Sequence, residues 1–148
     1  MADDDRAPPF TVRISGSECA VRDGLLQVLG HIRNLNLSSE RISAIELVLA
    51  EILNNIVEHA LTKTHKRSDI EIQGHYSDRG LHLTVLDHGA SMPAGRMPAA
   101  LPPDVDVAVL DMPEGGFGWF MIHTLAQDIS YVRADGQNRL SLLLALDS

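Results

Sequence analysis

The chain has 148 residues, of which 45% are hydrophobic and 22% charged, a balance typical of one globular domain with a packed core. Its formal net charge is −8, with 20 acidic residues against 12 scattered Lys and Arg, which argues against a nucleic-acid binder. Cys19 is the only cysteine, and neither a signal peptide nor a membrane-spanning run is present. We therefore expect a protein of the reducing cytoplasm, with a disordered tail over residues 1–9 and one domain over 10–148.

The first part of the chain predicts one strand and two helices. Residues 10–14 alternate like a short strand, and Ser15 and Glu18 have the spacing of a capping box that starts a helix. Ser38 is the expected N-cap of a second helix, which runs to about Leu61. Its apolar residues recur at helical spacing, at Ile42, Ile45, Leu49, Ile52 and Ile56.

The second part predicts two β-hairpins that flank a long loop and a short helix from Gly116 to Leu125. The hairpin turns are expected at Ser77–Gly80 and at Asp135-Gly136. The expected strands are residues 70–76, 81–86, 129–133 and 140–146. This order favours an α+β fold, a two-layer sandwich in which a mostly antiparallel mixed sheet has helices on one face.

Glu51 and Asn55 lie four residues apart in the second predicted helix, so their side chains share one face. Both fall at the edge of the apolar stripe, where a side chain can reach a ligand while the helix packs on the core. A carboxylate there can accept a proton, and an amide oxygen can ligate Mg²⁺. An ordinary surface pair would have the same spacing, so these two residues alone do not define a site.

Asp87-His88-Gly89 directly follows an apolar strand. An aspartate at a strand end can accept a hydrogen bond from a ligand amine, and Gly89 would let the backbone approach a flat ring. The alternative is a plain Asp-x-Gly turn without a ligand.

A cluster of three glycines, Gly115, Gly116 and Gly118, surrounds Phe117 at the start of the short helix. Glycines can curl around a phosphate, and a helix N-terminus supplies N–H donors to it. The cluster is not a P-loop, because no Gly-Lys-Ser/Thr follows. It also does not directly follow a strand, as a dinucleotide-binding fingerprint does.

Together, these three elements resemble the nucleotide site of the Bergerat-fold (GHKL) ATPases, the superfamily of gyrase, Hsp90, histidine kinases and MutL. Glu51-x-x-x-Asn55 is similar to the first box, Asp87-x-Gly89 to the second and Gly116-x-Gly118 to the third. The resemblance spans nearly the whole chain. The short length and the phrase Pro-Glu-Gly-Gly-Phe-Gly-Trp-Phe-Met-Ile, residues 113–122, resemble the anti-sigma-factor serine kinase branch.

The resemblance implies ATP and Mg²⁺ as ligands, with a role for each motif. Asn55 would coordinate Mg²⁺ and Glu51 would be the general base, while Asp87 would bind the adenine amino group and Gly89 would lie close to the base. The backbone of residues 115–118 would hold the phosphates. Residues from about 93 to 114 would form the ATP lid.

The resemblance also implies a function and partners. The chain would be a Mg-ATP-dependent serine protein kinase and anti-sigma factor. It would phosphorylate a STAS-type anti-sigma antagonist and bind a sigma factor in partner switching, as a homodimer without direct contact to nucleic acid or membrane.

Two departures from the family pattern leave other hypotheses open. The second box ends in Ser91 where a glycine is common, and Glu114 stands where some family kinases have an arginine near the γ-phosphate. Arg96 could substitute for that arginine, although spacing does not show it. An ATP-binding anti-sigma or adaptor module without significant kinase activity is the alternative. A detached histidine-kinase catalytic domain is disfavoured, because no dimerisation helix pair surrounds His123.

Overall fold

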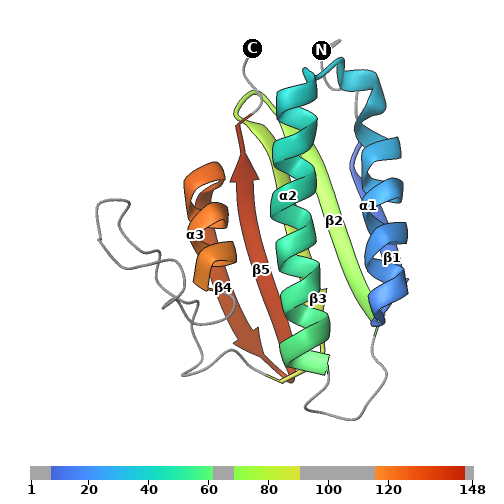
Figure 1. The fold of residues 1–148 in the computed structure, drawn as a ribbon, viewed down its shortest axis with the longest axis vertical. Helices are drawn as coiled ribbons and strands as arrows, with labels where there is room; N and C mark the ends of the chain where they lie inside the picture. The colour runs from blue at the N-terminus through green and yellow to red at the C-terminus, as the bar shows by residue number, and fades with distance from the viewer. Residues whose placement is uncertain (1–7, 62–68, 91–115, 146–148) are drawn as a thin grey trace.

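The computed structural model describes residues 8–61, 69–90 and 116–145. Three α-helices cover one face of a five-stranded sheet, which confirms the α+β sandwich (Figure 1). The sheet order is β1-β2-β3-β5-β4, and each of the four pairings is antiparallel. The strands are β1 (Phe10–Ser15), β2 (Asp69–Ser77), β3 (Gly80–Asp87), β4 (Gln127–Ala134) and β5 (Gln137–Leu144). The expected lid and nearly all of the expected tail lie outside the described residues.

The first helix, α1 (Glu18–Ile32), begins later than the capping box predicts. Ser15 is the last residue of β1, where it pairs with Asp69, so its backbone belongs to the sheet. Ser17 occupies the N-cap position instead, without a side-chain capping bond. The prediction of Ser15 as the cap was therefore wrong, because the backbone of this residue is paired in the sheet and the helix begins only after Ser17.

The second helix, α2 (Ser39–Asn55), follows a short 3₁₀ turn, η2 (Arg33–Leu35). Ser38 is its N-cap as predicted, since its side chain accepts a hydrogen bond from the Arg41 amide at 3.2 Å. Beyond Asn55 the helix widens into a π-helical segment, η3 (Ile56–Leu61). The helical stretch thus ends at the predicted residue, but its last turns are not α-helical. Such π segments are frequent at functional sites.

The core lies between the helices and one face of the sheet. On β3, every second residue points into it, at Leu81, Leu83 and Val85, and each of them pairs with a leucine on β5. The apolar stripe of α2 packs against this face, with Ile45, Leu49 and Ile52 almost fully buried. The third helix, α3 (Gly116–Leu125), is anchored to the same core by Trp119 and Ile122. Alternation in the strands and helical spacing in α2 therefore produce one continuous core.

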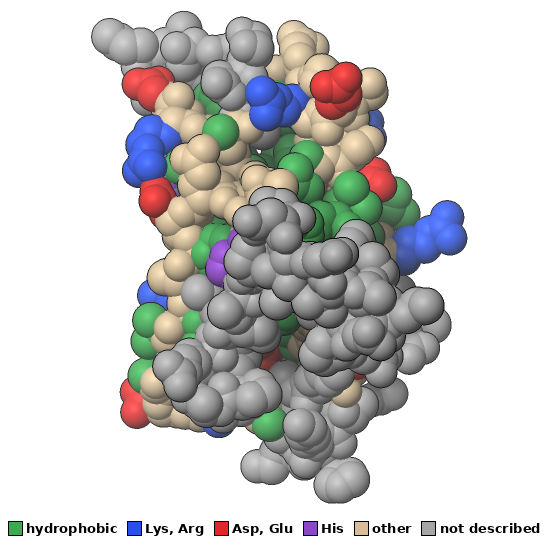
Figure 2. Space-filling model, turned by 60° about the vertical axis from the view of Figure 1, so that its left-hand side comes forward, with side chains coloured by type: hydrophobic (Ala, Val, Ile, Leu, Met, Phe, Trp, Pro, Cys, Tyr) green, Lys and Arg blue, Asp and Glu red, His purple; other side chains and the backbone are tan. Residues whose placement is uncertain are grey.

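The described residues on the face shown in Figure 2 form no patch of a single charge sign. Acidic and basic side chains are interspersed over the described part of that face. No helix within the described ranges is both long and apolar enough to span a membrane.

Candidate functional site

Asp87 is a buried carboxylate at the last position of β3, with only 3% of the residue exposed. Because side chains alternate across a strand, it shares the helix-facing side with Val85 and Leu83. Its Oδ1 accepts hydrogen bonds from the Gly89 amide at 2.8 Å and from the Asn138 side-chain amide at 2.9 Å. Within the described ranges, no group donates to its second oxygen, Oδ2. The turn therefore leaves one carboxylate oxygen available to a ligand donor.

The environment of Asp87 shifts the pKa of its carboxyl group. Burial raises the pKa of this carboxyl group above its ordinary value of 3.8. Hydrogen bonds from Asn138 and from the Gly89 amide oppose the shift, as do the charges of His88 and Arg133. A buried acid with specific partners at a strand end is characteristic of functional sites.

Asn138 is a site residue that the sequence analysis missed. It lies on β5 directly opposite Asp87 and is 5% exposed. It stands at the start of the core-facing side of β5, where the apolar residues Leu140, Leu142 and Leu144 follow at every second position. A lone amide in such a series, just after the Asp135-Gly136 turn, is the signal that could have identified it.

Glu51 and Asn55 lie side by side on the last turns of α2, as the spacing predicts, and both are partly exposed. Asn55 donates from Nδ2 to the backbone carbonyl of Glu51 at 2.8 Å, so its Oδ1 is left as an acceptor. No group within the described ranges donates to the Glu51 carboxylate. Between these two side chains, Ile52 and Leu53 are buried and fix the helix on the core.

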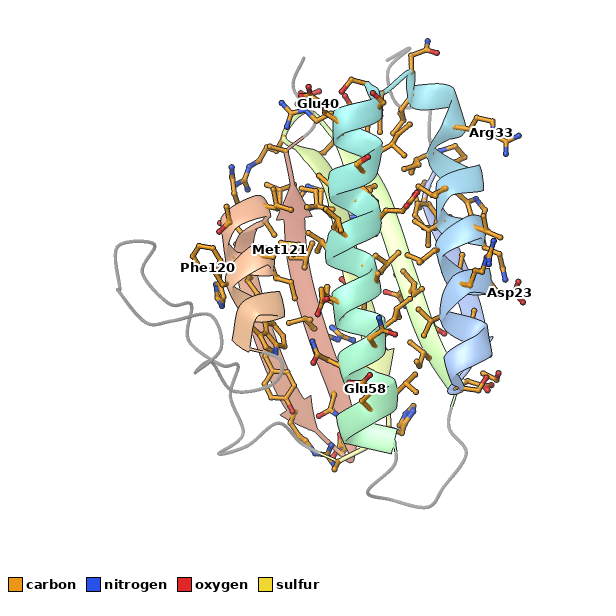
Figure 3. All side chains as sticks on the ribbon, viewed as in Figure 1. Asp23, Arg33, Glu40, Glu58, Phe120 and Met121 are labelled. Atoms are coloured by element: carbon orange, nitrogen blue, oxygen red, sulfur yellow. The ribbon has the colours of Figure 1, made fainter. Side chains whose placement is uncertain are left out.

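The third predicted element is described only in part. Gly116, Phe117 and Gly118 form the first turn of α3, as expected, whereas Gly115 lies outside the described residues. The buried ring of Trp119 holds this turn on the core and lies 6.3 Å from the His123 ring, centroid to centroid. Figure 3 shows Phe120 on the side of α3 away from α2.

The three elements are directed toward the same end of the molecule. β3 ends, β5 begins and α2 finishes at the lower end of Figure 1, and the N-terminal end of α3 points the same way. Glu58, which follows Asn55 by three residues, marks this end of the helix in Figure 3. The fold thus directs a carboxylate and amide on a helix, a buried acid at a strand end, and a glycine-rich helix start toward the same end of the molecule.

The described residues add no metal-ligand cluster to this site, and two further candidates lie outside the described part of the chain. No cluster of three or more metal-ligating side chains occurs in the described ranges. Arg96 and Glu114 lie outside those ranges, so their relation to the site stays a prediction.

A helix-covered antiparallel sheet with these motifs in this order defines the class of Bergerat-type ATP-binding domains. The chain belongs to the Histidine kinase-like ATPase domain family, whose model matches residues 17–144. Membership of this family implies that the chain binds ATP.

Individual relatives are consistent with this family. Serine-protein kinases RsbW of Bacillus cereus and Bacillus mycoides are each 28% identical over 116 residues, covering 78% of this chain and 71% of theirs. A crystal structure of the RsbU and RsbW domains of a Mycobacterium tuberculosis protein superposes with a TM-score of 0.66. That match covers 95% of this chain but 33% of the other, at 16% identity, and so establishes the fold alone.

Proposed function

We propose that the chain is a Mg-ATP-dependent serine protein kinase and anti-sigma factor that acts in partner switching. The observation that carries the proposal is the buried Asp87, held by Asn138 and the Gly89 amide, with an Oδ2 to which no described residue donates. The similarity to the RsbW serine-protein kinases supports the reaction type.

Asp87 is the residue we assign to the nucleotide base. An ionised carboxylate only accepts hydrogen bonds, so its Oδ2 suits the exocyclic amino group of adenine. Gly89 is buried next to it and carries no side chain that would block a flat ring. Preference for ATP over GTP follows from this acceptor.

Asn55 and Glu51 are the residues we assign to the phosphate end. No described residue donates to the Oδ1 of Asn55, so this atom is a suitable ligand for Mg²⁺, which would neutralise charge on the phosphates. The backbone amides at the start of α3, together with the amide of Gly115, would hold the phosphates themselves.

Glu51 is the proposed general base. Its carboxylate would accept the proton of the substrate serine hydroxyl while that oxygen forms its bond to the γ-phosphorus. The bond from this phosphorus to the bridging oxygen of ADP breaks in the same step. A partly exposed carboxylate with no described donor is free to take this proton.

The proposed partners are a STAS-type anti-sigma antagonist, which would be the phosphorylated substrate, and a sigma factor. Homodimerisation is part of the same proposal and rests on the resemblance to the kinase branch. Sedimentation at high micromolar concentration that shows only monomer would contradict the dimer.

An ATP-binding anti-sigma or adaptor module without significant kinase activity is the second candidate. It is favoured by Glu114, because a negative charge there would not stabilise a transferring phosphoryl group.

Phosphotransfer to a candidate antagonist from labelled ATP separates the two functions. The wild-type chain should label the antagonist, and Glu51→Gln should retain ATP binding but lose labelling by on the order of a hundredfold or more. Glu46→Gln, an exposed change on the same helix, is the matched control. ATP binding without labelling by the wild type would support the adaptor function instead.

A further inference from the structure

Asn138 has each hydrogen-bonding position of its side chain occupied by protein. Its Nδ2 donates to Asp87 Oδ1 and to the Ala90 carbonyl, both at 2.9 Å, with a longer contact of 3.4 Å to the Gly89 carbonyl. Its Oδ1 accepts from the Tyr131 hydroxyl and from Arg133 Nη1. A carboxamide offers two N–H groups and two lone pairs. Asn138 therefore keeps nothing for a ligand and can act on one only through Asp87.

Two residues of β4 determine which way the Asn138 amide faces. Arg133 and Tyr131 both donate, so the amide oxygen must lie on their side. The amide nitrogen must then lie on the side of Asp87. The reverse orientation would place an amide nitrogen against two donors and a carbonyl oxygen against a carboxylate. Arg133 also donates to the Gly89 carbonyl at 2.6 Å, which fixes the turn itself.

The orientation of Asp87 decides what a ligand meets. With Oδ1 occupied by two N–H donors, only Oδ2 remains, and it accepts but does not donate. Without Asn138, the carboxyl group could rotate or hold a proton and then offer an O–H group. Adenine presents an amino donor where guanine presents a carbonyl acceptor. An acceptor in this position distinguishes the two bases, and a hydroxyl does not.

We propose that Asn138 is the positioning residue of the base-binding site, held by Arg133 and Tyr131 so that Asp87 presents Oδ2 alone to the base. Asn138 and Arg133 thereby become determinants of the preference for adenine. This inference rests on the proposed assignment of Asp87 to the base.

The test is calorimetric titration of Mg-ATP and Mg-GTP into the wild type, Asn138→Asp and Arg133→Gln at several pH values. Asn138→Asp keeps the side-chain shape but sets two carboxyl groups against each other, which favours a shared proton. Above neutral pH, the ATP affinity of Asn138→Asp should be about ten- to hundredfold lower than that of the wild type. It should recover as the pH is lowered, because the shared proton restores a donor to Asp87 Oδ1. The wild type should show no such recovery.

Arg133→Gln provides a second variant on an exposed edge strand, should Asn138→Asp fail to fold. It should weaken ATP binding severalfold and reduce the ratio of ATP to GTP affinity. Arg139→Gln removes the same charge from a residue on the opposite face of the sheet, and it should bind like the wild type. The inference would be overturned if the wild type binds ATP and both Asn138→Asp and Arg133→Gln keep its affinity, its selectivity and its pH profile. Failure of the wild type itself to bind ATP would instead refute the proposed function.

Discussion

The side-chain amide of Asn55 donates a hydrogen bond to the backbone carbonyl of Glu51, one turn earlier on α2, at 2.8 Å. This bond uses an N–H of the amide and leaves the oxygen as the atom that a divalent cation requires. Asn55→Ala should therefore lower ATP affinity in Mg²⁺ by about tenfold or more, which corresponds to loss of one interaction with a charged group. Calorimetry with Mg²⁺ and with EDTA measures this, and the variant should lose its Mg²⁺ dependence. Asn54→Ala, at the exposed adjacent position, should leave the dependence intact.

Asp87→Asn should bind ATP more weakly yet unfold at a higher temperature. The amide would place a donor where the base needs an acceptor, at a loss of about ten- to hundredfold in affinity. Burial raises the pKa of Asp87 above 3.8, so the folded state binds this proton more tightly than the unfolded chain does. Stability is therefore lost as pH rises from 3.8 through the raised pKa, and the amide avoids this loss.

Thermal melts from acidic to neutral pH check the stability of Asp87→Asn. The difference in melting temperature from the wild type should be largest near neutral pH and shrink toward acid, where Asp87 is protonated in both states. Asp78→Asn, in the exposed turn before β3, is the control. An Asp87→Asn protein that is less stable than the wild type at neutral pH would contradict the argument.

His82 should make the fold sensitive to mild acid. Its ring stacks on that of His75 at 4.4 Å between centroids, and its Nε2 shares a hydrogen bond with the Ser77 hydroxyl at 2.8 Å. Burial, followed by the charges of His75 and Arg79, lowers the pKa of His82 below 6.5, and Asp128 opposes the shift. The unfolded chain then binds this proton first, so stability falls as pH drops below 6.5.

Urea unfolding at several pH values tests this role of His82. His82→Gln should lose less stability than the wild type between neutral pH and about pH 5.5, because the titrating group is gone. His31→Gln, at an exposed position on α1, is the control. Identical slopes of stability against pH in His82→Gln and the wild type would show that His82 does not contribute.

Two glycines in hairpin turns should respond differently to alanine. Gly80 has a φ of +136°, and a Cβ atom there would lie 2.3 Å from the Leu144 carbonyl oxygen. Gly136 has a φ of +76° with open space around it, so Gly136→Ala should cost only about 1–2 kcal/mol of conformational strain. Gly80→Ala should cost clearly more, since backbone must also move. Chemical denaturation of both variants measures the difference, and equal losses would exclude the collision.

Local patterns in the sequence were sufficient to predict most of the fold. Ser38 could be recognised as a cap because its effect extends only over the first helical turn. The hairpin turn at Asp135-Gly136 was equally local, since both residues adopt positive φ. The prediction of Ser15 as a cap was wrong because the competing interaction, its pairing with Asp69, comes from a residue far along the chain.

The candidate site was predictable only where its residues are neighbours in sequence. Glu51 and Asn55 share a helix face, and Asp87 and Gly89 share a turn, so their spacing was visible. Asn138 is 51 residues from Asp87, and only the register of β3 with β5 brings them together. The π-helical widening after Asn55 was also not visible, because apolar spacing in that stretch fits an α-helix.

The strand order has a consequence for how the chain acquires its ligand site. β5 follows β4 in the chain but is inserted between β3 and β4, so the sheet stays open beside β3 until β5 arrives. Such long-range pairings slow folding, because distant segments must lose conformational entropy before the contacts that stabilise them can form. A nascent chain that lacks β5 would hold Asp87 without Asn138, on a strand that is paired with β2 but has its other edge unpaired. Competence to bind nucleotide should therefore arise only once β5 has been made, after the helices and the other four strands.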